Sequence, residues 1–398
     1  MGYNTGDKQL IKEINKASIF QVVHDIGPVS RADIAKILKL TSATVSSNMA
    51  ELIDEGIVKE IGTGVSSGGR KPVLVTISDS GVCFLGVDIH KDGVEAAIVS
   101  LTGRILAIAE QPFQHETGNF EHDVLSCIRS VRGMAQGAKV KSIGIGMHGI
   151  VDTTKSISVF APAMARRNFD LKTFIEREEH LPVYVDNDAN AMALGENWFG
   201  QAKQMKNYVF LNVGRGIGSG LVLNGEVFRG SRYAAGEIGH IRVADNGIRC
   251  VCGKYGCLDT VATEYTVIRD VVSAIHTGVK SDVTNHVAGD LSAINIDTIL
   301  EAACAGDPCV LEILNKTGRF IGVAVSYVIN ILNPEMIILG GSMSRLGEYM
   351  MDSIQEAALS LSMKECSDGV KIVLSTLREK AGVIGAATLG MRNLFPRA

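Results

Sequence analysis

The chain contains 398 residues, of which 46% are hydrophobic and 21% charged, and its formal net charge is −4. This length and composition suit two or three domains with sizeable cores, and the small net charge excludes a protein that is basic throughout. No apolar run is long enough to span a membrane, no signal-peptide pattern opens the sequence, and the eight cysteines lack a disulfide spacing, so we expect a cytoplasmic protein with reduced thiols.

Residues 1–78 are predicted to form a winged helix-turn-helix domain. Apolar residues recur at helical spacing over 8–25, and a glycine and a proline then end that helix. Ser30 caps a second, short helix, and a third begins at Ser42. Two short helices joined by a tight turn after a first helix are typical of DNA-binding helix-turn-helix proteins. Residues 57–78 indicate two strands flanking a glycine-rich tip, which is a wing.

Candidate DNA contacts lie on the third helix and on the wing. The outward face of the helix carries short donors and acceptors that suit phosphates and base edges in a major groove, and the wing tip carries two cations. The predicted DNA-binding residues are Ser42, Thr44, Ser46, Ser47 and Asn48 on the helix and Arg70 and Lys71 on the wing. The alternative is a winged helix that contacts protein and has a solvated polar face. Because such modules usually bind two half-sites as pairs, we expect a homodimer or a dimer of dimers on operator DNA.

Residues 79–398 alternate strands with helices, which predicts an α/β domain with mostly parallel sheets covered on both faces. Three successive strands begin at Cys83 and lead to a helix, and a similar succession follows Asn207. This repeated succession resembles the superfamily of sugar kinases, Hsp70 and actin, in which two similar lobes enclose a cleft. We expect lobe I at about 79–197 plus the C-terminal helix, and lobe II at about 198–384.

One histidine and three cysteines gather in the stretch 236–259. A histidine nitrogen and three thiolates are the ligand set of a closed tetrahedral zinc site, which leaves no position for water. Glycines between the last cysteines allow a tight loop that brings the ligands back to one ion. The alternative is a chance cluster of buried cysteines. We predict a structural Zn²⁺ held by His240, Cys250, Cys252 and Cys257.

Four motifs give the chain a family resemblance: the wing ending in SSGGRKP, then DNDANAMALGE, GEIGH and CVCGKYGCLD. On these motifs the chain resembles the ROK family of repressors and sugar kinases over nearly its whole length, and most of all the repressors of the xylose and N-acetylglucosamine type. The resemblance implies a winged helix-turn-helix followed by a two-lobed, actin-like sugar kinase fold. It also implies that the four zinc ligands match those of the family one for one.

The resemblance further implies a sugar or sugar-phosphate effector in the cleft of the ROK domain. Asn187 and Asp188 match the pair that holds sugar hydroxyls, a task for which an amide and a carboxylate are suited. Their alternative role is a helix N-cap, and both roles can hold together. Glu237 and His240 match two further contacts, and Asp259 stands where the family commonly has glutamate.

Gly149 and Arg166 complete the expected effector-binding residues. The histidine before Gly149 stands where relatives more often have proline, and Arg166 stands in a stretch where family members often show asparagine and tryptophan. Together with Arg167, these side chains would make a cationic rim for a phosphate or carboxylate. The alternative is that both arginines are solvated loop residues.

Phosphoryl transfer requires glycine turns that hold phosphates. Where family kinases resemble Asp-x-Gly-Gly-Thr, this chain has VDIHKDG, and its second turn reads GRGIGSG, with Arg215 in place of threonine. We therefore expect no enzyme and no catalytic residue, and Asp188 would act as a base only in a kinase. The predicted function is a sequence-specific transcriptional repressor of carbohydrate-metabolism genes. The alternative is an ATP-dependent sugar kinase with a DNA-binding arm.

Overall fold

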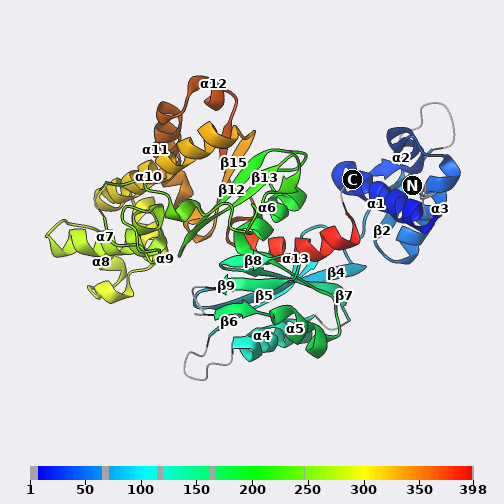
Figure 1. Cartoon of the computed structure of the whole chain (residues 1–398), viewed down its shortest axis with the longest axis horizontal. Helices are drawn as coiled ribbons and strands as arrows, with labels where there is room; N and C mark the ends of the chain where they lie inside the picture. The colour runs from blue at the N-terminus through cyan, green and yellow to red at the C-terminus, as the bar shows by residue number, and fades with distance from the viewer. Residues whose placement is uncertain are drawn as a thin grey trace. The chain divides into compact units, whose positions relative to one another are not determined.

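The structure is a computed structural model that describes residues 8–64, 71–113, 120–135, 137–161, 166–245 and 247–396. The chain divides into two compact units, one formed by residues 1–186 with 386–398 and the other by residues 187–385. Figure 1 labels the helices and strands of both units. Among the described residues, no helix is long and apolar enough to cross a membrane.

The first unit begins with the predicted winged helix. Its helices are α1 (Lys8–Ile26), α2 (Arg31–Leu38) and α3 (Ser42–Asp54), and its strands are β1 (Val29–Ser30), β2 (Val58–Thr63) and β3 (Val73–Ile77). The strands pair antiparallel in the order β1-β3-β2. Side-chain caps start the two short helices: Ser30 Oγ and Thr41 Oγ1 each accept a backbone N–H three residues later at 3.1 Å. The three helices and two wing strands are confirmed, whereas β1 was not predicted.

Residues on both sides of the large domain contact the winged helix in the first unit. Near the C-terminus, Phe395 stacks on Phe20 of α1, with ring centroids 3.7 Å apart and planes inclined by 13°. After the wing, Gly81 lies against Gly56, so closely that a Cβ on Gly81 would come within 1.6 Å of the Gly56 carbonyl oxygen. Gly56 itself has a φ of 75°, which favours glycine. A side chain on Gly81 would displace the backbone, and one on Gly56 would be strained by that φ and would lie 3.3 Å from the Cα of Gly81.

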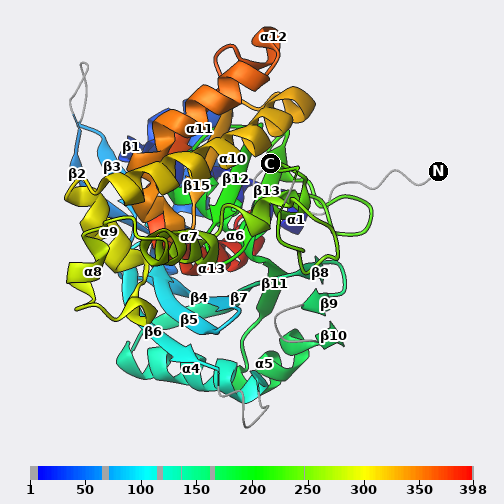
Figure 2. The same ribbon diagram turned by 90° about the vertical axis from the view of Figure 1, so that its left-hand side faces the viewer.

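A five-stranded sheet in the order β11-β7-β4-β5-β6 forms the body of the first unit. Its strands are β4 (Val82–His90), β5 (Gly93–Ser100), β6 (Ile105–Pro112), β7 (Lys139–Met147) and β11 (Val183–Asn187). Figure 2 shows α4 (Phe120–Met134) and α5 (Leu171–Glu179) along one face of this sheet. On the other face, Gly144 of β7 lies against the backbone of Ala386 in α13 (Ala381–Leu394). A small sheet of β8 (Ile150–Asp152), β9 (Ile157–Ala161) and β10 (Arg166–Phe169) was not predicted.

The second unit contains a sheet with the same strand succession, in the order β14-β13-β12-β15-β16. Its strands are β12 (Tyr208–Val213), β13 (Ile217–Leu223), β14 (Glu226–Val227), β15 (Met336–Gly340) and β16 (Lys371–Leu374). β12, β13 and β14 pair antiparallel, and β12, β15 and β16 pair parallel. The expected repeat of three strands is therefore confirmed. The prediction of mostly parallel sheets is wrong, because the short turns between the opening strands make those strands antiparallel.

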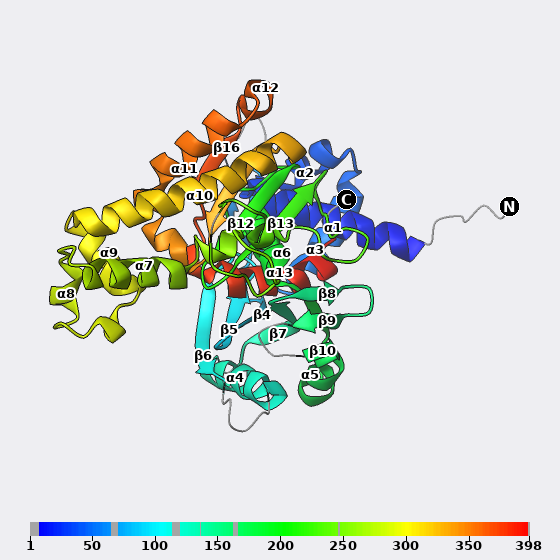
Figure 3. The same ribbon diagram turned by 60° about the vertical axis from the view of Figure 1, so that its left-hand side comes forward.

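The helices of the second unit surround its sheet. They are α6 (Asp188–Phe199), α7 (Glu264–His276), α8 (Val283–His286), α9 (Ile296–Cys304), α10 (Pro308–Leu332), α11 (Gly347–Leu361) and α12 (Lys364–Ser367). α6 packs on β12 and β13, and Figure 3 shows α10 and α11 packed along each other.

Candidate metal centre and effector site

The loop between β14 and α7 brings the four predicted metal ligands together. It folds back on itself through isolated β-bridges between Arg242 and Cys257 and between Arg249 and Tyr255. Gly256 has a φ of 75°, a conformation that residues with a Cβ rarely adopt. The backbone of the loop is thus shaped by glycine and by its own β-bridges.

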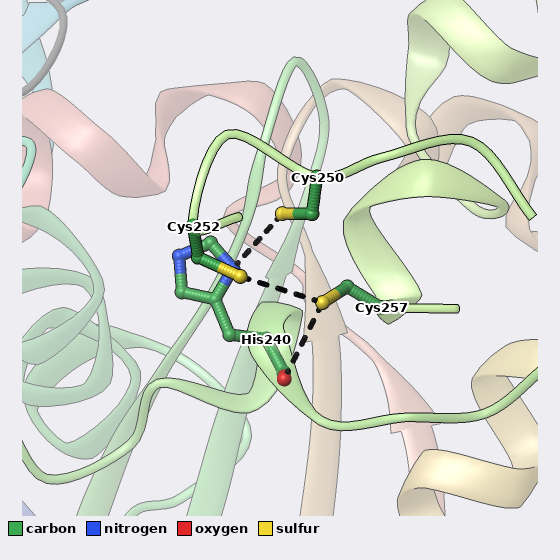
Figure 4. A group of neighbouring side chains, drawn as sticks. All are labelled: His240, Cys250, Cys252 and Cys257. Atoms are coloured by element: carbon green, nitrogen blue, oxygen red, sulfur yellow. Dashed lines mark hydrogen bonds between the residues drawn. The ribbon is translucent and has the colours of Figure 1, made fainter. Parts of the chain in front are cut away.

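The ligand atoms of His240, Cys250, Cys252 and Cys257 all lie within 4.8 Å of one another, and their side chains converge in Figure 4. His240 Nδ1 lies 3.5 Å from Cys250 Sγ, and Cys252 Sγ lies 3.6 Å from Cys257 Sγ. A tetrahedron built on Zn–S bonds of about 2.3 Å has edges of roughly 3.7 Å. The spacing of these atoms therefore fits a tetrahedral metal site, and the cluster can hold a metal ion.

The three thiols of the cluster differ in acidity. Burial, followed by the neighbouring thiols, raises the pKa of Cys257 to about 12, and burial raises the pKa of Cys250. The backbone N–H of Lys254 bonds to the exposed Cys252 thiolate and lowers its pKa. A metal ion bound here would have to displace protons from the two buried thiols.

Asn187 and Asp188 stand where β11 passes into α6. The Asn187 side-chain oxygen accepts the N–H of Asn190 at 3.1 Å, and its amide donates to Asp188 Oδ1 at 2.8 Å. Asp188 Oδ1 also accepts the N–H of Ala189 at 2.9 Å. The N-cap role of Asn187 is confirmed. The same bonds fix both side chains at the N-terminus of α6, where the helix dipole stabilises a carboxylate.

Strand β13 lies against both segments that carry predicted sugar contacts. A Cβ on Gly218 would lie 3.5 Å from the Cβ of Ala189, in the first turn of α6. A Cβ on Gly236 would come within 2.4 Å of the Ser219 carbonyl oxygen, so the GEIGH segment also rests directly on the backbone of β13. One strand therefore positions the Asn187–Asp188 pair and the residues of GEIGH.

Asp259 connects the metal loop to the glycine turn before β13. Its Oδ1 accepts the backbone N–H of Ile217 at 2.8 Å, and its Oδ2 lies 3.9 Å from His240 Nδ1. On the other edge of the ring, His240 Nε2 lies 4.0 Å from Glu237 Oε2. Our sequence reasoning missed the bond to Ile217, which commits one Asp259 oxygen to structure. A cavity of about 510 Å³ borders the loop, lined by His240, Arg242, Asp245, Lys254, Tyr255 and Cys257.

The other two predicted effector residues belong to the first unit. Gly149 has a φ of 109° in the turn between β7 and β8. Arg166 opens β10 opposite Ala161, and its side chain lies outside the described residues. Arg167 is exposed, and its guanidinium lies 4.2 Å from the centre of the Phe160 ring, a cation–π contact.

The structure places the predicted DNA-binding residues of α3 at different depths. Ser42, Ser46, Ser47 and Lys71 are exposed, and Thr44 is half-buried. The placement of Asn48 on this face is wrong: its side chain is 4% exposed, and its amide donates to the Thr44 carbonyl at 2.9 Å. Asn48 follows the buried Val45 by one helical turn, so it points into the domain. Arg70 lies outside the described residues.

The glycine turn of 214–220 is hydrogen-bonded to the start of α7, which is bonded in turn to the segment after β15. Ser342 Oγ donates to Glu264 Oε2 at 2.8 Å, and the Glu264 N–H donates to the Gly214 carbonyl at 2.9 Å. These bonds tie the glycine turn of 214–220 to the segment after β15. The cavity beside Gly340 measures about 10 Å³, which is room for roughly one water molecule.

The chain matches the ROK family model over residues 84–393. It is 31% identical over 397 residues to the xylose repressor of Caldicellulosiruptor bescii, with 98% of each chain covered. It is also 28% identical over 393 residues to the N-acetylglucosamine repressor of Shigella flexneri, covering 98% of this chain and 95% of that protein.

Two solved structures are similar over long stretches. A ROK family transcriptional regulator, described as a homolog of the Escherichia coli MLC protein, has a TM-score of 0.79 and 30% identity, with 97% of both chains covered. A ROK family glucokinase from Streptomyces griseus, in complex with glucose and AMPPNP, has a TM-score of 0.72 and 29% identity, covering 78% of this chain and 99% of the glucokinase. These likenesses confirm the predicted fold, a winged helix-turn-helix followed by a sugar-kinase-like α/β fold.

Proposed function

The chain belongs to the ROK family, and we propose that it is a transcriptional repressor of carbohydrate-metabolism genes whose DNA binding responds to a sugar or sugar phosphate. The observation that carries this proposal is the winged helix of residues 8–77, which precedes the region matched to the family. The similar repressors align along this part of the chain as well, whereas the similar glucokinase covers only 78% of it. Selection of bound DNA from a random pool, repeated with sugars added, tests the proposal. A protein that enriches no sequence would contradict it.

Operator DNA is bound through α3 and the wing. Exposed Ser42, Ser46 and Ser47 on α3 offer hydroxyls to phosphates and base edges. Lys71, with Arg70 before it, supplies cations at the wing. The alternative, a winged helix that contacts protein, predicts that changes on this face leave DNA affinity unaltered.

Replacing Ser46 with aspartate should weaken binding to the selected DNA by about tenfold or more, because a carboxylate on the exposed face of α3 repels phosphates. Fluorescence anisotropy with labelled DNA measures the affinity. Ser130→Asp, at an exposed position of α4 outside the winged helix, is the matched control and should bind as wild type. Equal affinities for the two variants would contradict the assignment of α3 as the recognition helix.

A structural Zn²⁺ is held by His240, Cys250, Cys252 and Cys257. The metal fixes the loop and the histidine ring in place. Because all four ligands come from the protein, no coordination position is left open for chemistry. With Nδ1 towards the cysteines, His240 presents its Nε2 edge beside Glu237. The metal centre therefore holds in place the edge of the His240 ring that binds sugar.

The effector is bound by hydrogen bonds to its hydroxyls. Asn187, Asp188, Glu237, His240 and Asp259 supply an amide, three carboxylates and an imidazole, with Gly149 and Arg166 as further expected contacts. An effector that has unequal affinity for open and closed arrangements of the two lobes shifts their populations. A changed separation of paired recognition helices would weaken repression, because the duplex fixes the distance between half-sites.

If Arg166 and Arg167 form a cationic rim, a phosphorylated or acidic sugar should raise the melting temperature while neutral sugars do not, because guanidinium groups bind phosphate and carboxylate. Thermal shift with D-xylose, D-glucose, N-acetylglucosamine and their phosphate esters measures this. The described contact of Arg167 with Phe160 is compatible with the alternative, in which both arginines are surface residues. A larger shift with xylose or glucose alone would make the rim hypothesis wrong.

The chain is not a kinase. The similarity to repressors over 98% of this chain and Arg215 in place of threonine in the second glycine turn support this. The alternative, a sugar kinase with a DNA-binding arm, requires ATP turnover that depends on Asp188 as the base. A coupled ATP assay over hexoses and amino sugars distinguishes them, since turnover lost in Asp188→Asn would favour the kinase.

The protein acts in the cytoplasm as a homodimer or a dimer of dimers. An apolar group on the second unit supports self-association: it includes Tyr327 and Ile331 of α10 and, at the end of α11 and just after it, Leu359, Leu361 and Met363, all more than 40% exposed. Ile331, at 78% exposed, is the most accessible of the group.

Replacing Ile331 with aspartate should convert the oligomer to a smaller species, because a carboxylate at a buried interface is desolvated. Light scattering coupled to gel filtration measures the mass. Val251→Asp, at a 94% exposed residue of the metal loop, is the control and should keep the wild-type mass. An unchanged mass in Ile331→Asp would place the subunit interface elsewhere.

A further inference from the structure

We propose that α13 transmits the state of the effector site from α6 to the winged helix, with Phe395 as the positioning residue at its far end. The inference deepens the proposed function and rests on it. It follows from three sets of contacts, at the start, along the length and beyond the end of α13.

At its start, α13 touches α6 backbone to backbone. A Cβ on Gly385 would come within 2.3 Å of the Ala191 carbonyl oxygen, and a Cβ on Gly195 would lie 3.0 Å from the Cα of Gly385. No side chain lies between the helices at these points to absorb a displacement. Because α6 begins at the Asn187–Asp188 pair, a ligand that moves this pair moves the helix on which α13 rests.

Along its length, α13 belongs to both compact units. The chain passes between the units twice, at 186–187 and at 385–386. The first passage leads directly into α6, and the second lies within α13 at the contact with α6. Both passages are therefore tied to the same helix. The α13 helix continues without interruption to Leu394, and its later part packs on the first sheet, where Gly390 lies against Ser142 and Phe84.

Beyond its end, α13 leads into the core of the winged helix. Phe395 is 2% exposed and stacks on Phe20 of α1, which is fully buried. α1 in turn packs on α3, and ion pairs join Lys12 to Glu51 at 2.6 Å and Lys16 to Glu55 at 2.5 Å. A displacement of the Phe395 ring therefore reaches the recognition helix through one intervening helix.

The test uses the full chain and the DNA that it selects. Phe395→Ala removes the ring, Phe395→Tyr keeps it, and Leu394→Ala changes the 44% exposed neighbour that precedes it. We expect Phe395→Ala to lose most of the sugar-induced change in DNA affinity, while its sugar affinity in thermal shift stays within about twofold of wild type. Tyrosine at 395 and alanine at 394 should behave as wild type. The sugars used are D-xylose, N-acetylglucosamine and their phosphate esters.

A second measurement perturbs the other end of the helix. Gly385→Ala forces α6 and α13 apart, and hydrogen exchange of the α1 amides reports the effect in the winged helix. We expect amide protection in α1 to change by about tenfold in Gly385→Ala and in Phe395→Ala, with that of α4 unaltered. Should Phe395→Ala fail to fold, Phe395→Leu takes its place.

Wild-type responses in Phe395→Ala, or unchanged α1 exchange in Gly385→Ala, would overturn the proposal. If no sugar alters the DNA affinity of the wild-type chain, the effector part of the proposed function fails. The exchange experiment then decides the coupling by itself: altered α1 protection in Gly385→Ala supports the path through α13, and unaltered protection excludes it.

Discussion

Replacing Cys252 with serine is expected to remove the metal and to weaken sugar binding by about ten- to a hundredfold, because a metal site with three ligands no longer fixes the ring of His240. The bound zinc should fall from about one ion per chain to near zero, and the melting temperature should fall with it. Elemental analysis, thermal unfolding and calorimetric titration with the sugar that gives the largest thermal shift measure the three quantities.

Cys304→Ser is the matched control for this change. Cys304 is likewise exposed, and a serine there can keep the bond with the Tyr349 hydroxyl, which lies 3.1 Å from the sulfur. It should retain metal, stability and sugar affinity. If Cys252→Ser lost zinc but kept wild-type sugar affinity and DNA release, the metal would only stabilise the loop and would not support the sensor.

Replacing Asp188 with asparagine is expected to weaken sugar binding by about ten- to a hundredfold, since hydrogen bonds to a charged group contribute about 1.5–3 kcal/mol. The operator should then stay bound at sugar concentrations that release the wild-type protein. Titration calorimetry measures the affinity, and anisotropy measures DNA release. Asp245→Asn is the control, because that carboxylate is 99% exposed beside the metal loop and should not affect sugar binding.

The same variant separates the two roles of this pair. Asn187 keeps its own cap bond to Asn190 in Asp188→Asn, so α6 should lose only the favourable charge at its N-terminus, about 0.5 kcal/mol. If the pair only caps the helix and binds no sugar, Asp188→Asn should lose a little stability and keep the wild-type sugar affinity. That result would remove Asp188 from the effector site.

The sequence predicted those elements whose ends carry local signals. Ser30 and Thr41 cap the helices of the winged helix through their own side chains, and Pro308 opens α10, so propensity and structure agree there. The metal cluster was predictable because Cys250, Cys252 and Cys257 lie close together in sequence. In these cases, residues that are close together in sequence were sufficient to predict the structure.

The predicted exposure of Asn48 was wrong. A polar side chain at that position suggested an exposed face, yet Val45, Asn48, Met49 and Leu52 are all buried along one stripe of α3. Their spacing of three and four residues is the helical repeat, so periodicity already indicated the burial. The position of Asn48 in the helical repeat indicates its burial better than its polar side chain does.

Other features depend on contacts distant in sequence. The bond from Ile217 to Asp259 joins residues 42 positions apart, and no local pattern marks it. The antiparallel opening of each sheet, by contrast, could have been deduced from the short turns between its first strands. The packing of Gly385 on α6 is likewise invisible in the sequence until the two helices are placed together.

The contact between Gly56 and Gly81 has a consequence for protein engineering. A chimaera that joins the winged helix of one regulator to the sensor of another will be cut near residue 78, between these two positions. If the sensor donor carries a residue larger than glycine at 81, the backbones cannot close to the separation found here, and a larger residue at 56 adds a strained φ and a tight contact. Exchange of recognition modules is therefore constrained by a matched pair of residues, and transplanting 56 and 81 together should rescue hybrids that transplanting the DNA-binding segment alone leaves poorly assembled.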